Sequence, residues 1–204
     1  PDYGNSWVKI NNGIPMGAFT RVVREDPERK DLLFAGTELG IYMSWNGGKD
    51  WVPFQLNLPV TPVTDLKIHQ GNLIAATSGR SFWILDDLSL LHQYKKDTTS
   101  FSIFEPSPAY LVNGSSELDE SNADFTGASK YRGVNPSTGV VLYYQLPKLK
   151  DSMAILTLEI KDAAGNLVRT FSSKADSTFK KYDGGPSGEP LLSKETGLNR
   201  FVWN

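Results

Sequence analysis

The sequence contains no cysteine and only two histidines, His69 and His92, among 204 residues. The absence of cysteine excludes a disulfide scaffold and any zinc site built from thiolates. Two histidines also leave little material for a histidine-rich metal site or a histidine-based catalytic triad. We therefore expect no bound metal and no cofactor.

The sequence also has no large excess of charge of one sign and no long apolar run. Lys and Arg number 21 against 23 Asp and Glu, a formal net charge of −2. This balance gives no field that would steer the chain onto nucleic acid. No apolar stretch approaches the ~20 residues of a membrane-spanning helix. Because the first residue is Pro1 rather than Met, we expect a processed chain or a piece of a longer protein.

The sequence is rich in turn residues and contains an internal repeat. It has 18 glycines and 12 prolines, a level typical of a turn-rich β protein. Asp2–Trp7 reads D-x-G-x-S-W, and Ser44–Trp51 has the related pattern S-x-N-x-G-x-D-W. The two closing tryptophans, Trp7 and Trp51, are 44 residues apart, which sets the period of the repeat.

The segments between these tryptophans also repeat. Thr20–Arg24 corresponds to Thr64–Ile68, 44 residues later, and Leu33–Thr37 corresponds to Leu73–Thr77, 40 residues later. The difference of four indicates a shorter hairpin in the second copy, where repeats tolerate a change of length.

Each repeat unit predicts about four short strands with alternating apolar side chains. The expected inward positions of the first unit are Val22, Leu33, Ala35, Ile41 and Met43. Four strands in roughly 40–45 residues is the size of one propeller blade. Residues 1–94 therefore predict about two blades, which are too few to close a ring.

The repeat ends after Trp83, and a different β pattern follows. Asp86–Leu91 predicts a short helix with an aspartate at its start, and residues 95–100 predict a polar linker. Residues 101–204 predict a small antiparallel β-sandwich with a long loop at 113–138. Its expected strands are Val140–Leu146, Ala154–Lys161, Leu167–Ser172 and Asn199–Asn204, with a hairpin turn at Asp162–Asn166 and with Leu156, Leu158 and Ile160 on one face.

The D-x-G-x-[ST]-W pattern is the heart of the Asp-box, and the chain resembles exported bacterial BNR-repeat proteins named glycosyl hydrolases, whose propellers are sortilin-like. The first box has the family's residues at Asp2, Gly4, Ser6 and Trp7. The second box consists of Ser44, Asn46, Gly48, Asp50 and Trp51, with Asn46 and Asp50 departing from the family's Asp and Ser or Thr. Thr77–Asp87 resembles the closing blade of these proteins.

In that family a β-sandwich follows the propeller. Its motifs are similar to Tyr144–Pro147, Glu159–Gly165 and Asn199–Trp203 of this chain, and it is also similar to the immunoglobulin-like domain of the flagellar hook-cap protein. The resemblance implies an all-β chain, with a partial propeller of about two four-stranded blades at 1–94 and an immunoglobulin-like sandwich at 101–204. It also implies export to the periplasm, cell surface or medium.

The chemistry-bearing residues give weak signals for catalysis. The resemblance implies that the Asp-box residues are structural, because the box stabilises its own turn. Glu38, Arg80 and Trp83 are the residues that we consider ligand-facing. The arginines have no spacing typical of a sialidase triad, and Asp86 with Asp87 is better explained as a helix cap than as a glycosidase carboxylate pair.

Acidic residues gather in the expected long loop. They are Glu117, Asp119, Glu120 and Asp124. Oxygen ligands at short spacing can hold Ca²⁺, but this spacing does not match an EF-hand. A solvated acidic loop is the preferred interpretation.

Three functions follow from these patterns. The first is a binding or assembly role without a catalytic centre in this chain, with the remaining blades supplied in cis or by a partner protein. The second is part of a sialidase-like glycoside hydrolase whose catalytic residues lie mostly on missing blades; the family's name rests on the propeller fold, which does not establish chemistry. The third is a sortilin-like peptide receptor. A glycan or a peptide is the ligand class expected.

Overall fold

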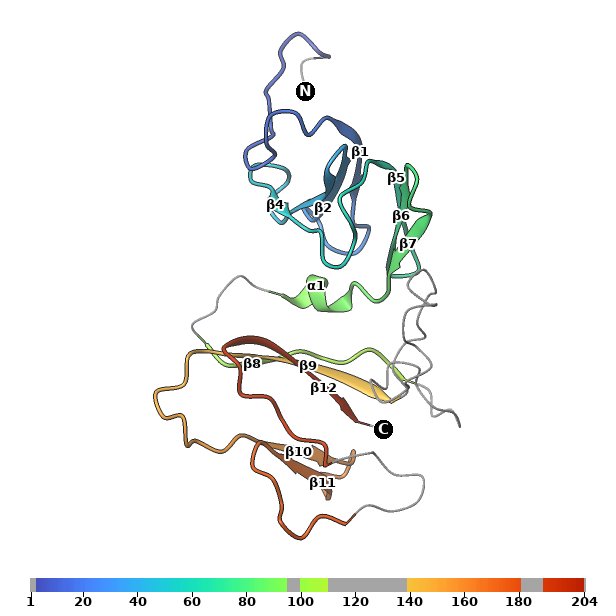
Figure 1. Ribbon diagram of the computed structural model, residues 1–204. Coiled ribbons are helices and arrows are strands. Elements are labelled where there is room, and N and C mark those ends of the chain that lie inside the picture. Colours follow the sequence, from blue (N-terminus) through green and yellow to red (C-terminus); the bar gives the residue numbers. More distant parts are fainter. Residues whose placement is uncertain (1–2, 95–99, 110–138, 181–188, 204) are drawn as a thin grey trace. The chain divides into compact units, whose positions relative to one another are not determined.

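The computed structural model describes residues 3–94, 100–109, 139–180 and 189–203. Within them the chain is mostly β, with several antiparallel sheets and one short helix (Figure 1). It divides into two compact units, Pro1–His92 and Gln93–Asn204. The acidic loop at 113–138, with its four carboxylates, and linker residues 95–99 lie outside the described residues.

The first unit begins with a four-stranded antiparallel sheet. Its strands β1 (Thr20–Glu25), β2 (Leu33–Thr37), β3 (Gly40–Ser44) and β4 (Val52–Pro53) are paired in chain order. The β2–β3 turn is closed by the Thr37 hydroxyl, which donates to the Gly40 carbonyl at 2.9 Å. The predicted four-stranded unit is thus confirmed for the first repeat.

The second repeat has three strands in the described residues, not the four expected. β5 (Val63–His69), β6 (Asn72–Thr77) and β7 (Phe82–Leu85) are paired in chain order, and helix α1 (Ser89–Gln93) follows. Asp87 caps this helix, since its carboxylate accepts the Ser89 N–H at 3.0 Å. Leu88 is completely buried in the core, and a helix follows β7 where the first repeat has its fourth strand.

Strand register corrects the repeat correspondence by one residue. Thr20 pairs with Thr37, Val63 pairs with Thr77, and both pairings are followed by a bulge. Thr20 therefore corresponds to Val63, 43 residues later, and the expected match of Thr20 with Thr64 is wrong. The period of 44 still holds just before this strand, where Ile14 N–H donates to Asn11 O and Leu58 N–H donates to Gln55 O. One residue fewer in the connection between Leu58 and β5 accounts for the change.

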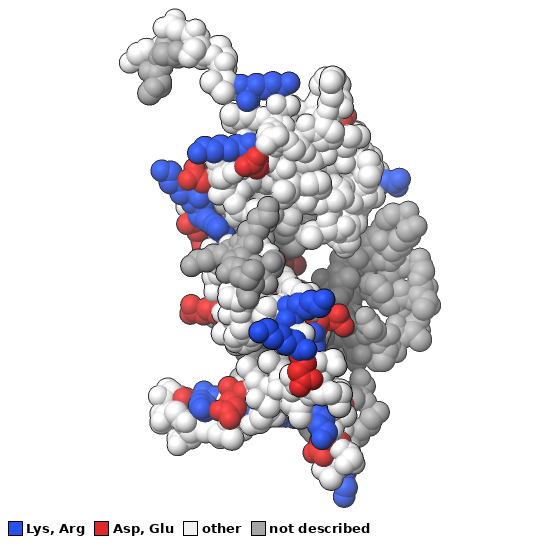
Figure 2. All heavy atoms as spheres, turned by 90° about the vertical axis from the view of Figure 1, so that its left-hand side faces the viewer, with Lys and Arg blue, Asp and Glu red and all other residues white. Residues whose placement is uncertain are grey.

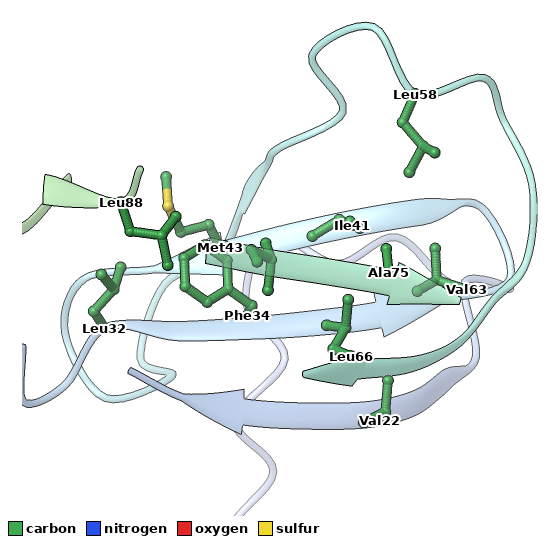
Figure 3. Close-up of a cluster of buried hydrophobic side chains, with 11 residues drawn as sticks. Val22, Leu32, Phe34, Ile41, Met43, Leu58, Val63, Leu66, Ala75 and Leu88 are labelled. Atoms are coloured by element: carbon green, nitrogen blue, oxygen red, sulfur yellow. The ribbon is translucent and has the colours of Figure 1, made fainter. Parts of the chain in front are cut away.

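The two sheets of this unit pack face to face on a shared core (Figure 3). The first sheet contributes Val22, Phe34, Ile41 and Met43, the second contributes Val63, Leu66, Leu73 and Ala75, and the connections contribute Leu32, Leu58 and Leu88. At about 25 cal/mol per Å² of apolar surface, this burial is the main stabilising term of the unit.

The expectation that Leu33 and Ala35 share a face with Met43 is wrong. Phe34 pairs with Met43 and Ala35 pairs with Tyr42, so Ala35 lies on the opposite face, in a second cluster with Ala18, Tyr42 and Trp51. Because both faces of β2 are covered, its apolar residues run continuously and the alternation that predicts an inward face is lost.

The sheets are stacked in a head-to-tail manner. In the second sheet, Leu73 and Ala75 point toward the first sheet. Their equivalents by register are Leu33 and Ala35, which point away from the second sheet. The face that the second sheet turns toward the first is therefore the equivalent of the face that the first sheet turns toward Ala18 and Trp51.

The second unit contains two more sheets. β8 (Ser102–Ile103), β9 (Val140–Leu146) and β12 (Gly197–Trp203) form one in the order β12-β9-β8, and β10 (Thr157–Lys161) with β11 (Leu167–Ser172) forms a hairpin. The strands predicted at Val140–Leu146 and Leu167–Ser172 are confirmed; the strand expected from Ala154 starts at Thr157.

The two sheets of the second unit share one core. Its buried residues are Leu142, Tyr144, Leu146, Phe171, Leu192 and Phe201. Leu156, Leu158 and Ile160 pack against it, as their alternation predicts. Phe171 and Phe201 join the sheets through a tilted ring contact, with centroids 4.7 Å apart.

Candidate functional site

The turn of the second Asp-box is formed by hydrogen bonds among its own residues. The buried Ser44 hydroxyl donates to Asn46 Oδ1 at 2.9 Å and accepts the Gly48 N–H at 3.0 Å. Asn46 Oδ1 also accepts the Asp50 N–H at 2.9 Å. The amide oxygen of Asn46 therefore keeps the acceptor role expected of it, and the turn forms without the usual aspartate.

The two departures from the family pattern compensate each other. Asn46 Nδ2 donates to Asp50 Oδ2 at 2.8 Å. In the first box the corresponding residues are Asp2 and Ser6, an acceptor followed by a donor; here Asn46 is the donor and Asp50 the acceptor. A side-chain hydrogen bond therefore joins the two residues that depart from the pattern.

The second box also binds the segment before the first sheet. Asn12 Nδ2 donates to Asp50 Oδ1 at 2.6 Å, and the Trp51 indole donates to the Ile10 carbonyl at 2.8 Å. Gly13 has φ of +96°, and a Cβ there would lie 2.0 Å from the Trp51 carbonyl oxygen. Only glycine allows this approach. The box thus has a structural role, because its hydrogen bonds hold Ile10 and Asn12 next to Trp51.

The first Asp-box lacks this packing. Tyr3 and Gly4 have φ values of +57° and +86°, so a turn is present, but Trp7 is 90% exposed whereas Trp51 is 5% exposed. Asp2 lies outside the described residues.

Glu38, considered as a ligand-facing residue, is bound by an arginine. Arg21 forms an ion pair with it, and Arg21 Nε donates to Glu38 Oε1 at 2.6 Å. Both side chains are partly exposed, and such a surface pair contributes about 0–1 kcal/mol to stability. The guanidinium of Arg21 therefore occupies a carboxylate oxygen that a ligand would otherwise contact.

Arg80 and Trp83 lie in the β6–β7 turn and strand. The Trp83 indole donates to the Arg80 carbonyl at 2.8 Å, and the Arg80 N–H donates to the Thr77 hydroxyl at 3.1 Å. The Arg80 side chain is exposed, while Trp83 packs against the shared core. Trp83 is therefore mainly a packing residue.

Sequence reasoning missed a cluster of ionisable side chains around His92. Its Nε2 lies 3.0 Å from Oδ2 of the buried Asp26, and its Nδ1 lies 3.3 Å from Glu28 Oε2. Asp26 also accepts the N–H groups of Glu28 and Arg29, each at 2.8 Å. The cluster fastens α1 to the β1–β2 hairpin. The partners are 66 residues apart, so no local pattern signals the pairing.

A metal-binding group is not found in the described part of the chain, where no three His, Asp, Glu or Cys residues are arranged to hold an ion. His69 is exposed at the end of β5. Asp86 is exposed beside the capping Asp87. In the part of the chain that the structure describes, no hydrogen bond or ion pair joins Glu38, Arg80, Asp86 or His69 to one another.

The second unit has a small apolar pocket between β8, β9 and β10. Ile103, Leu142, Leu158 and Leu192 are among its lining residues. Tyr144 also lines it, and burial raises the pKa of this phenol, whose hydroxyl donates to the Ser193 carbonyl at 2.8 Å. The phenol stays protonated at neutral pH and acts as a structural donor.

Surface charge is mixed. On the face drawn in Figure 2, basic and acidic side chains lie interspersed, and ion pairs such as Arg24 with Asp65, 2.8 Å apart, neutralise part of the charge. No helix among the described residues has the length and apolar character to cross a membrane.

Comparisons with known proteins add no relative. No family model matches the chain. No curated protein and no solved structure matches it either.

Proposed function

We propose that residues 1–94 are two blades of an exported Asp-box propeller and that residues 101–204 are an immunoglobulin-like sandwich. In this proposal the chain serves in binding or assembly and has no catalytic centre of its own. The remaining blades come from the same protein or from a partner, and the recognised ligand is a glycan or a peptide. Exposed propeller faces and sheet edges suit such recognition.

The observation that carries the propeller proposal is the head-to-tail stacking of the two repeat sheets. Ala75 faces the neighbouring sheet, while its equivalent Ala35 faces the other way. When two unlike faces form the interface, one sheet after another can be added until the rotation between successive sheets closes a ring. A ring of four-stranded sheets with this stacking is a propeller.

The bonding of the candidate residues supports a role other than catalysis. The polar side chains of the second Asp-box form hydrogen bonds within their own turn and with Asn12. Glu38 is bound by Arg21, and Asp87 caps α1. In the second unit, two sheets that share one core support the sandwich assignment.

Two measurements on the full chain test this function. Native mass spectrometry of the protein isolated from its source is expected to find it joined to further Asp-box sheets, in a longer chain or a complex. A solitary chain would contradict the assembly role. Incubation with 4-methylumbelliferyl sialoside is expected to give no turnover, with Glu38→Gln as the matched variant. Turnover that Glu38→Gln abolishes would overturn the non-catalytic assignment and favour the hydrolase.

A further inference from the structure

The outer face of the second sheet is apolar and exposed. Phe82 is 76% exposed and Ile84 is 60% exposed, and both belong to β7. Ile74, paired with Ile84, is half-buried beside them. We call Ile74, Phe82 and Ile84 the outer face. Adjacent large apolar side chains of this kind mark an interaction surface.

Strand register identifies what this face corresponds to in the first sheet. Ile84 pairs with Ile74 as Met43 pairs with Phe34, and Phe82 corresponds in the same way to Ile41. Met43 and Ile41 are only 2% and 6% exposed, because the second sheet covers them.

The flanking charge repeats as well. Arg24 is paired with Phe34 in the first sheet, and Lys67 is paired with Ile74 in the second. The outer face therefore reproduces both the apolar centre and the basic border of a surface that already binds a sheet. It is the equivalent, in the second sheet, of the first-sheet face that packs in the shared core.

We propose that the outer face docks a further antiparallel sheet of the same repeat, presented by a partner. This inference rests on the propeller proposed above and names the chemistry of the missing neighbour: a Leu-x-Ala face like that of Leu73 and Ala75. A second copy of the chain is unsuitable, because its Leu73–Ala75 face covers its own first sheet. Its Ala35 is also fully buried, beneath Ala18 and Trp51.

The test supplies such a sheet within the full chain. A second copy of residues 44–85 is inserted in place of Leu85, so that β7 is followed by a complete Asp-box from Ser44 to Trp51, a fourth strand and a third sheet. Since the natural sequence has no cysteine, Ile84→Cys in the original β7 gives a single thiol. Its reaction with a thiol reagent is expected to slow at least about tenfold in the extended chain.

Two controls fix the interpretation. Leu167→Cys, at a position 58% exposed in the second unit, is expected to react at the same rate with and without the insert. An insert whose copied sheet carries Leu66→Asp and Ala75→Asp has the same length and displaces α1 equally, but offers a charged face. It is expected to leave Ile84→Cys reactive.

Distinct outcomes overturn the proposal. Equal reactivity of Ile84→Cys beside the apolar and the charged inserts would show that the face does not hold the sheet that fits it. An insert that stays protease-sensitive would show the same. In the chain without an insert, Ile84→Cys and Leu167→Cys are expected to react within about threefold of each other. A much slower Ile84→Cys would mean that the chain or a second copy already covers the face. None of these results changes the native-mass test of the proposed function.

Discussion

The two Asp-boxes have related sequences and opposite environments. In the second box, Trp51 is 5% exposed between Ala18, Ala35 and Tyr42; in the first, Trp7 is 90% exposed. Positive φ at Gly4 and at Gly48 shows that both form turns. The motif thus determines a turn. Burial of its tryptophan needs two further surfaces, a sheet on one side of the ring and the segment that precedes the sheet on the other.

The two sheets of the first unit differ in the same way. The first has both faces covered, and the second has one. Positions that are equivalent by strand register are buried in one sheet and exposed in the other. Whether a position in this repeat is buried therefore depends on the sheet packed against it.

The largest expected effect separates the two tryptophans. Trp51→Ala should lower the free energy of unfolding of the first unit by about 3–5 kcal/mol, because it leaves a cavity under β2 and β3. Trp7→Ala should change it by less than about 0.5 kcal/mol. Hydrogen exchange of the β2 and β3 amides under increasing urea measures both. Similar losses from the two variants would break the comparison.

The next effect separates the two sheets. Met43→Ala should cost about 2–5 kcal/mol, since its side chain fills the shared core. Ile84→Ala, at the equivalent position, should cost less than about 0.5 kcal/mol in the chain without an insert. Urea unfolding followed by the same amide signals decides this. A large loss for Ile84→Ala would contradict the assignment of its face as uncovered.

A smaller effect tests the hydrogen bond between Asn46 and Asp50 in the second box. Asn46→Asp places a carboxylate opposite Asp50, so we expect a loss of about 1 kcal/mol. Asn46→Asp combined with Asp50→Ser gives the residue types that the first box has at Asp2 and Ser6, and the serine hydroxyl should donate to the new carboxylate and recover most of the loss. A double-mutant cycle measures the coupling. Additive losses would disprove the compensation.

The smallest effect concerns a turn that has no tryptophan to bury. The Asn166 side chain, followed by backbone N–H donors, lowers the pKa of Asp162. Because the folded-state pKa lies below the unfolded one, the contribution of this turn is present above the ordinary carboxyl value of about 3.9 and is lost as pH falls through the lowered pKa.

Asn166→Ala should therefore raise the pKa of Asp162 toward its ordinary value. A ¹³C NMR titration of the carboxyl carbon measures the change. Asp176, whose pKa is lowered mainly by the Thr178 hydroxyl, is the internal control and should not move. An unchanged Asp162 titration would show that the side-chain bond is not the main cause.

Much of the strand pattern was predictable. The strand Val140–Leu146 and the return strand Leu167–Ser172 have the predicted bounds, because alternating side chains and the Asp162–Asn166 turn act over a few residues. The inward face of β2 was not predictable, because Leu33, Phe34 and Ala35 are all apolar. Nor was the one-residue shift from Thr64 to Val63, because it comes from a shorter connection before β5 and shows only in the strand pairing.

The candidate residues show the same division. The acceptor role of Asn46 follows from its chemistry, whereas the Arg21–Glu38 pair and the His92–Asp26 pair depend on strand and helix positions distant in sequence. A sequence motif carries no information on a partner 66 residues away.

The sequence by itself determined the β class, the repeat and its turns, since these arise from side-chain alternation and from hydrogen bonds within a few residues. Only the tertiary structure decided which faces are covered: Met43 is buried and Ile84 exposed at equivalent positions. The physical reason is that burial of apolar surface requires a second surface, and a strand's own residues do not specify whether that neighbour is present.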